Sequence, residues 1–212
     1  MGNNVFGLGC TPSIIDGSEM IFEISKNLEL PKEYSFQNEM SPVLNQGNTN
    51  MCVTYSLGAH IDWNINMDYM TERKDNQVDR KAIYNSRKTP GDAGMTFKEA
   101  FSYLRKHGVK TDVGNRKIEY YAKINDIQSL KEALIINGPC VGGMTVYNYD
   151  PEFWNKKAND KSKGGHAISI VGYNKDGFII RNSWGPNWAF KGYSTLLYKD
   201  FKKMFEIWTI ID

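Results

Sequence analysis

The sequence has few cysteines and no long hydrophobic run. Its three cysteines stand at positions 10, 52 and 140, and no pair of them has the spacing of a metal site. An odd number cannot close into a complete set of disulfides, so a reducing compartment is the simpler inference. No apolar run approaches membrane-spanning length, and the N-terminus lacks the basic start and apolar stretch of a standard signal peptide. We expect a soluble protein, cytoplasmic or virion-associated.

An excess of charge of one sign is also absent. The chain carries 26 Lys and Arg against 24 Asp and Glu, a formal net charge of +2. A nucleic-acid binder typically shows a clustered basic stripe or a recognisable module, and the sequence has neither. The hydrophobic fraction of 41% and the aromatic fraction of 13% are those of a globular protein. We therefore expect a monomer of one large domain or two packed halves, without nucleic-acid or membrane partners.

Helix signals dominate the first part of the chain. Apolar residues recur at helical spacing after Cys52, Thr96 and Glu99 form a capping box, and Asp126 can cap another helix. These patterns predict helices over about 52–70, 96–107 and 126–137, with a polar loop over 71–91.

Strand signals dominate the second part. Runs of β-branched and aromatic residues, punctuated by Gly, Asn and Asp, predict strands over 140–147, 167–173, 178–181, 193–198 and 205–211. Helices first and strands second indicate an α+β architecture of two halves that meet at a cleft. Residues 1–29 read as an irregular arm with one short strand near 20–24.

Cys52 stands directly at the start of its predicted helix. Unpaired backbone N–H groups and the positive end of the helix dipole stabilise a thiolate there, and the thiolate is the nucleophilic form of cysteine. A lone cysteine, however, is more often a buried and inert thiol. The chemical interpretation of Cys52 therefore depends on partners elsewhere in the chain.

A thiol nucleophile needs a base, and a base needs a group that orients it. His60 lies within the Cys52 helix and His107 at a helix C-terminus, where each has a structural explanation. His166 instead begins an apolar strand after two glycines, and a hairpin through residues 174–177 brings Asn182 back toward it. An Asn amide there can hold one imidazole nitrogen and leave the other facing the thiol.

Four blocks of the sequence, in this order, resemble those of papain-like cysteine peptidases. They are Gln46-Gly47, Cys52 at the head of a helix, Gly165-His166-Ala167 and Asn182-Ser183-Trp184-Gly185. The resemblance extends from about residue 30 to the C-terminus, and four ordered blocks are far more specific than one. It implies a papain-like α+β fold, mainly helical over 30–138 and mainly antiparallel β over 139–212, with the active-site cleft between the halves.

The resemblance also implies roles for single residues. Cys52 corresponds to the nucleophile, His166 to the general base, and Asn182 to the residue that orients the imidazole. Gln46 corresponds to the oxyanion donor, alongside the backbone N–H of Cys52. The implied activity is that of a thiol endopeptidase, which hydrolyses peptide bonds of a peptide or protein substrate through an acyl-enzyme thioester. It implies no metal and no cofactor.

The resemblance places a substrate site around the triad. Gly94 and Met95 correspond to the loop that pairs with an extended peptide, and Trp184 to the ring over the His166 to Asn182 hydrogen bond. Small residues fall near the main specificity pocket, which we expect to be roomy and apolar; they are Gly143, Gly164 and Ala167, with Gly165 beside them.

The sequence departs from the family pattern around the nucleophile. Val53 stands where an aromatic residue is usual, and Thr49 stands where a disulfide cysteine is usual, which agrees with a reduced protein. Two other interpretations stay open: an amidase, transpeptidase or cell-wall peptide hydrolase that uses the same triad, and an inactive papain-like binding module. The arm over 1–29 is either structural packing, which we favour, or an inhibitory propeptide-like segment.

Overall fold

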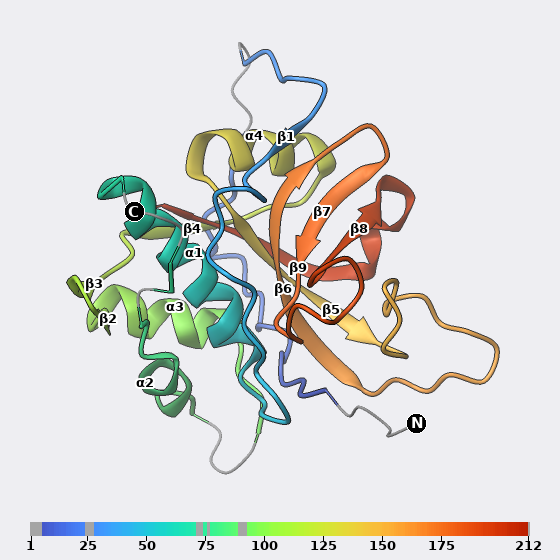
Figure 1. Ribbon diagram of the computed structural model, residues 1–212, viewed down its shortest axis with the longest axis horizontal. Coiled ribbons are helices and arrows are strands. Elements are labelled where there is room, and N and C mark those ends of the chain that lie inside the picture. The colour runs from blue at the N-terminus through green and yellow to red at the C-terminus, as the bar shows by residue number, and fades with distance from the viewer. Residues whose placement is uncertain (1–5, 24–27, 71–73, 76, 89–92, 212) are drawn as a thin grey trace.

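Figure 1 shows the computed structural model, which describes residues 6–23, 28–70, 74–75, 77–88 and 93–211. Three of the helices gather on one side of the molecule, and a large antiparallel sheet with the fourth helix packed against it forms the other, so the fold is α+β as the sequence predicts (Figure 1). The helices are α1 (Cys52–Asp68), α2 (Arg80–Asn85), α3 (Phe97–Lys106) and α4 (Ile127–Asn137), with a 3-10 helix, η1, over Tyr198–Lys203.

The three predicted helices are confirmed within about two residues of their expected ends. The capping box of α3 is present, because the Thr96 side chain accepts from the N–H of Glu99 and the Glu99 side chain accepts from the N–H of Thr96. The prediction of a loop over 71–91 was wrong for α2. Asp79 caps this helix by accepting from the N–H of Ala82, and burial of Ile83 holds it to the core. Residues 71–73, 76 and 89–91 of the predicted loop lie outside the described residues.

The main sheet has the strand order β4-β9-β5-β6-β7-β8, and a short strand, β1, also pairs with β6. A separate hairpin joins β2 to β3. The five strands predicted for the second half are confirmed, whereas the sequence reading missed the four short strands of the first part. The strands are β1 (Tyr34–Ser35), β2 (Val109–Thr111), β3 (Gly114–Arg116), β4 (Tyr120–Lys123), β5 (Cys140–Val146), β6 (Gly164–Tyr173), β7 (Gly177–Arg181), β8 (Tyr193–Leu197) and β9 (Met204–Ile211).

The hairpin of β6 and β7 brings His166 and Asn182 close together. Ser169 of β6 pairs with Arg181 of β7, so Asn182 follows directly at the end of β7, near the start of β6 where His166 lies. A register shift between Ile170 and Gly172 bends this pairing. The expected short strand near 20–24 reduces to a single bridge from Ile21 to Lys123, and residue 24 lies outside the described residues.

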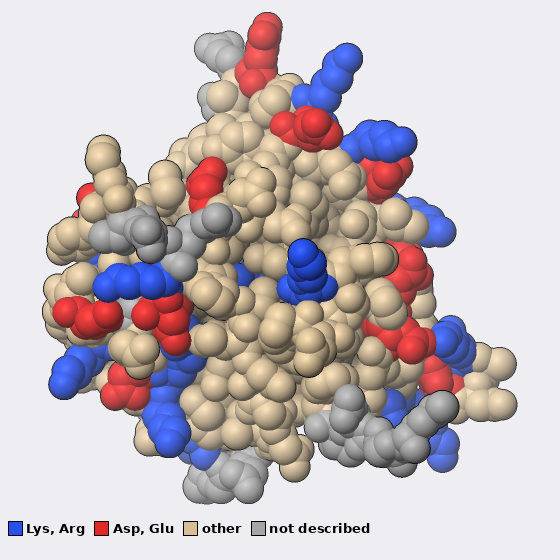
Figure 2. Space-filling model, in the orientation of Figure 1, with Lys and Arg blue, Asp and Glu red and all other residues tan. Residues whose placement is uncertain are grey.

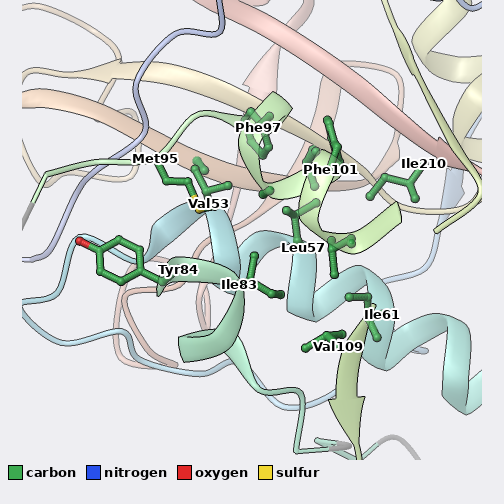
Figure 3. Packing of buried hydrophobic residues seen from close by; sticks show 14 of the residues in the cluster. Val53, Leu57, Ile61, Ile83, Tyr84, Met95, Phe97, Phe101, Val109 and Ile210 are labelled. Carbon is green, nitrogen blue, oxygen red and sulfur yellow. The ribbon is translucent and has the colours of Figure 1, made fainter. Parts of the chain in front are cut away.

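Helix α1 packs between the other helices of its half, α2 and α3, and the sheet. Its apolar stripe is buried against α2, α3 and the end of β9, as Figure 3 shows for Val53, Leu57 and Ile61. A second cluster lies on the other side of the sheet, between α4 and the strands, and includes Trp184. Burial of this stripe fixes the start of α1, and with it Cys52, against the sheet.

Charges are spread over the surface rather than gathered. Lys and Arg side chains alternate with Asp and Glu around the face seen in Figure 2, with broad uncharged areas between them. Among the described residues, no helix is both long and apolar enough to cross a membrane.

Candidate active site

Cys52 is the first residue of α1 and is fully buried. Its sulfur lies near the backbone N–H groups of Ala167 and Val53, each of which lowers the pKa of the thiol. Ala167 directly follows His166, so the sulfur lies beside the strand that carries the predicted base. The structure thus brings the thiol at position 52 to the start of β6.

His166 is held by Asn182. The Nε2 atom of His166 lies 2.7 Å from the Asn182 Oδ1 atom, and both side chains are buried. Among the described residues, the Nδ1 atom of His166 has no hydrogen-bond partner. The same Asn182 oxygen accepts from the N–H of Ser183 at 2.7 Å, which fixes the amide. The imidazole is therefore oriented through Nε2, while Nδ1 remains available for another proton partner.

Trp184 covers this pair. Its ring stacks on the His166 ring with the centroids 4.5 Å apart and the planes 27° from parallel. Trp184 is almost fully buried, and its indole N–H donates to the Gly7 carbonyl at 3.0 Å. An apolar ring at this position keeps water from the His166 to Asn182 hydrogen bond, which strengthens that bond.

Gln46 lies beside the same group of residues. Its Oε1 atom accepts from the Ser183 hydroxyl at 2.6 Å, so the side chain has one orientation. Its Nε2 atom donates to the Thr49 carbonyl at 2.7 Å and to the Leu8 carbonyl at 3.4 Å. The donor predicted for an oxyanion hole therefore already contacts two backbone carbonyls. The nearer one belongs to the loop before Cys52 and the other to the N-terminal arm.

The described part of the arm crosses the site in extended form. The Gly7 N–H donates to the Gly47 carbonyl at 2.8 Å, and the Gly9 N–H donates to the Gly165 carbonyl at 3.0 Å. The Phe6 ring stacks on Trp184 with centroids 5.0 Å apart. Sequence reasoning missed these contacts. Residues 1–5 lie outside the described residues.

Arm and cleft fit each other too closely for larger side chains. A Cβ atom added at Gly7 would lie 2.0 Å from the Thr49 carbonyl oxygen, and one at Gly165 would lie 2.0 Å from the Cys10 carbonyl oxygen. Glycine at these two positions lets two backbones approach directly.

The predicted substrate residues lie along this arm. Met95 donates its N–H to the Gly9 carbonyl at 2.8 Å. Cβ atoms added to two further glycines would also meet the arm, at 2.4 Å from the Gly9 oxygen for Gly94 and at 3.3 Å from the Leu8 side chain for Gly164. A Cβ at Gly143 would instead meet the Phe205 ring at 2.3 Å. The roomy pocket stays a prediction, and in this structure the arm and the Phe205 ring lie against the glycines expected to line it.

The arm fills the groove beside the site. Its backbone is bonded to Gly47, Gly165 and Met95, and Cβ atoms added at Gly94 and Gly165 would overlap it. The arm and an extended peptide therefore cannot occupy this groove together.

Burial changes the acid–base state of the site. It raises the pKa of the Cys52 thiol to about 12, against smaller opposing effects of nearby N–H groups. It lowers the pKa of His166 to about 4, although the Asn182 hydrogen bond acts in the opposite direction. The start of α1 was expected to stabilise a thiolate, but the loss of hydration on burial outweighs the effect of the nearby N–H groups. Both groups are neutral near neutral pH in this closed state.

The lowered pKa of His166 predicts that the folded protein loses stability in acid. The folded protein keeps His166 neutral down to about pH 4, whereas the unfolded chain protonates it near its ordinary pKa of 6.5. The stabilisation is therefore complete above that ordinary pKa and is lost as the pH falls through this window, by roughly 3 kcal/mol in the free energy of unfolding. Urea unfolding at a series of pH values measures it.

A pair of variants isolates this histidine. His166→Gln should remove the component, while His107→Gln, at an exposed histidine, should retain it. An equal acid loss in wild type and His166→Gln would contradict a neutral buried imidazole.

Comparison with known proteins identifies the family to which this chain belongs. A family model described as papain family cysteine protease matches residues 52–207, well over half of the chain. The chain belongs to the papain family of cysteine proteases.

Relatives agree with this membership. An uncharacterized peptidase C1-like protein of Acanthamoeba polyphaga mimivirus is 24% identical over 89% of this chain and 71% of its own length. Pro-cathepsin H of Bos taurus is 24% identical over 74% of this chain and 56% of its own, so the chain spans little more than half of that relative.

Solved structures share the fold. The crystal structure of xylellain, a cysteine protease from Xylella fastidiosa, has a TM-score of 0.83 and 25% identity, covering 97% of this chain and 96% of that chain. A procathepsin B from Trypanosoma congolense has a TM-score of 0.77 at 14% identity, covering 96% and 85% of the two chains, which shows the fold alone.

Proposed function

We propose that the chain hydrolyses peptide bonds as an endopeptidase, through a Cys52, His166 and Asn182 triad and an acyl-enzyme thioester. The observation that carries this proposal is the 2.7 Å hydrogen bond from His166 to Asn182, next to the strand residue whose N–H lies against the Cys52 sulfur. This arrangement fixes the imidazole through Nε2 and leaves Nδ1 for the thiol proton.

In the first step, Nδ1 takes the thiol proton as sulfur attacks the carbonyl carbon of the scissile peptide bond. His166 then gives this proton to the leaving amine, and the acyl group stays on sulfur as a thioester. Water, deprotonated by the same nitrogen, attacks the thioester and releases the acid, which restores the thiol. Asn182 keeps the ring in place through both proton transfers.

Negative charge develops on the carbonyl oxygen in each tetrahedral intermediate. We assign its stabilisation to the Gln46 side-chain amide and the Cys52 backbone N–H. The Leu8 carbonyl, 3.4 Å from the Gln46 Nε2 atom, supports this assignment, because it places a peptide carbonyl within reach of the donor. Each fixed donor of this kind is worth about 3 kcal/mol.

The arm supports a second part of the proposal, namely that the substrate groove is closed while the arm is in place. Its backbone occupies the groove that an extended substrate requires, bonded to Met95 and Gly165. Displacement of the arm opens the groove and rehydrates Cys52 and His166. Their pKa values then move back toward the ordinary range, which permits a thiolate and imidazolium pair.

Product analysis tests the reaction class. The chain, with and without arm displacement, is incubated with unstructured peptides, with peptidoglycan fragments and with added amine acceptors, in water enriched in ¹⁸O. We expect internal cleavage of peptides with one ¹⁸O atom in each new carboxyl group. Transfer of the acyl group to the amine in preference to water, or cleavage of peptidoglycan peptides alone, would replace the endopeptidase with a transpeptidase or a cell-wall hydrolase.

A further inference from the structure

Cys10 lies in the arm where it passes the site, and the backbone on both of its sides is fixed. The N–H groups of Gly9 and Cys10 both donate to the Gly165 carbonyl at 3.0 Å. On the other side, the Thr11 N–H donates to the Met95 carbonyl at 3.1 Å, so that Cys10 and Met95 form a parallel bridge. Cys10 is thus held between the residue before His166 and the predicted substrate loop.

These attachments place Cys10 in the same buried cluster as Cys52. This apolar cluster also holds Met95 and Ala167. Met95 lies directly beside Val53, the residue after Cys52, in Figure 3. Burial raises the pKa of Cys10, and a charge on Cys52 raises it further. Burial also raises the pKa of Cys52, against a smaller lowering by the N–H of Cys10.

We propose that Cys10 and Cys52 form a reversible disulfide that locks the arm over the active site when a peroxide oxidises Cys52. Formation of this bond rests on the arm geometry alone, and its inhibitory effect rests on the proposed function of Cys52. The bond makes position 10 a site of redox modification that couples the arm to the nucleophile.

The chemistry needs one two-electron oxidant, for example hydrogen peroxide. When the arm lifts, the Cys52 thiolate attacks one peroxide oxygen; an S–O bond forms, the O–O bond breaks, and the leaving hydroxide takes up a proton to become water. When the arm returns, the Cys10 thiolate attacks the Cys52 sulfenic acid; an S–S bond forms and a second hydroxide leaves as water. Each sulfur gives up one electron, and the peroxide accepts both.

The remaining cysteine is placed differently. Cys140 is buried in the second cluster, across the sheet, and its thiol faces the Gly138 carbonyl at 3.7 Å. A disulfide requires Cα atoms within about 7 Å of each other. We therefore expect Cys140 to be excluded from the bond, which makes it the matched control cysteine.

Mass spectrometry of the full chain tests the proposal without any activity assay. The reduced protein is treated with hydrogen peroxide at one equivalent, free thiols are alkylated, and a non-reducing digest is mapped. We expect the Cys10 to Cys52 crosslink to exceed any crosslink to Cys140 by about tenfold or more, and to disappear with dithiothreitol. Cys140→Ser should form the same crosslink. A Cys52 that accumulates as sulfinic acid with Cys10 still alkylatable would overturn the proposal.

A second readout uses Cys10→Ser, which removes the resolving thiol and keeps its size. After the same peroxide treatment, alkylatable Cys52 should return with dithiothreitol in the wild type but fall several-fold in Cys10→Ser, because sulfenic acid proceeds to irreversible forms. Equal recovery in both would contradict the lock. If the crosslink forms and no peptide is cleaved by the reduced protein after its arm has been displaced, the proposed function fails while the disulfide stands.

Discussion

Cys52→Ala is expected to lower kcat for peptide hydrolysis by about 10⁴-fold or more, because the thioester route depends on this one sulfur. The fold should persist, since alanine is only slightly smaller than cysteine. Steady-state kinetics on an arm-displaced form measures the loss, and circular dichroism monitors the fold.

Cys140→Ala is the matched control for this experiment. It removes an equally buried thiol from the cluster across the sheet, and its pKa is raised by burial to about 12 like that of Cys52. We expect kcat to stay within about twofold of the wild type, because this residue lies in a different cluster from Cys52. Turnover that survives Cys52→Ala, or is lost equally in Cys140→Ala, would remove Cys52 from the mechanism.

Displacing the arm is expected to have the second largest effect. In Gly7→Ala the new methyl group would lie 2.0 Å from the Thr49 carbonyl oxygen, and neither backbone can yield cheaply. The arm should leave the groove, and the alkylation rate of Cys52 near neutral pH should rise by about 100-fold, because an exposed thiol recovers its ordinary pKa. Timed alkylation with iodoacetamide and peptide mapping measures it.

An arm residue outside the groove provides the comparison. Ile14 is 83% exposed, so Ile14→Ala should leave the alkylation rate of Cys52 unchanged. A deletion of residues 1–15 should match or exceed the effect of Gly7→Ala. Labelling of the intact protein at the same rate as both variants would mean that the arm packs on the fold without closing the site.

The candidate site residues could be placed in the fold from the sequence because each one has a local signal. Cys52 precedes a helical stripe, and the turn between β6 and β7 is short enough to return Asn182 to His166. Local signals also sufficed for α3, because its capping box lies within four consecutive residues. Elements with such signals could be placed from the sequence alone.

The arm had no such signal. Its contacts with Gly47, Gly165 and Met95 are made by backbone groups, which every residue except proline carries. Only the glycines at positions 7 and 9 reflect the close approach, and glycine has many other uses. The neutral state of Cys52 escaped prediction for the same reason, because it depends on burial by a segment distant in sequence.

The most direct test of the account is the mass of the intact protein after rapid mixing of the Gly7→Ala form with a peptide ester and quenching in acid. We predict a mass increase equal to the acyl group, mapped to Cys52 and removed by neutral hydroxylamine, as a thioester requires. It should be absent in Cys52→Ala and present in Cys140→Ala. Ester turnover without an acyl group on Cys52, or with the acyl group on another residue, would contradict the proposed mechanism.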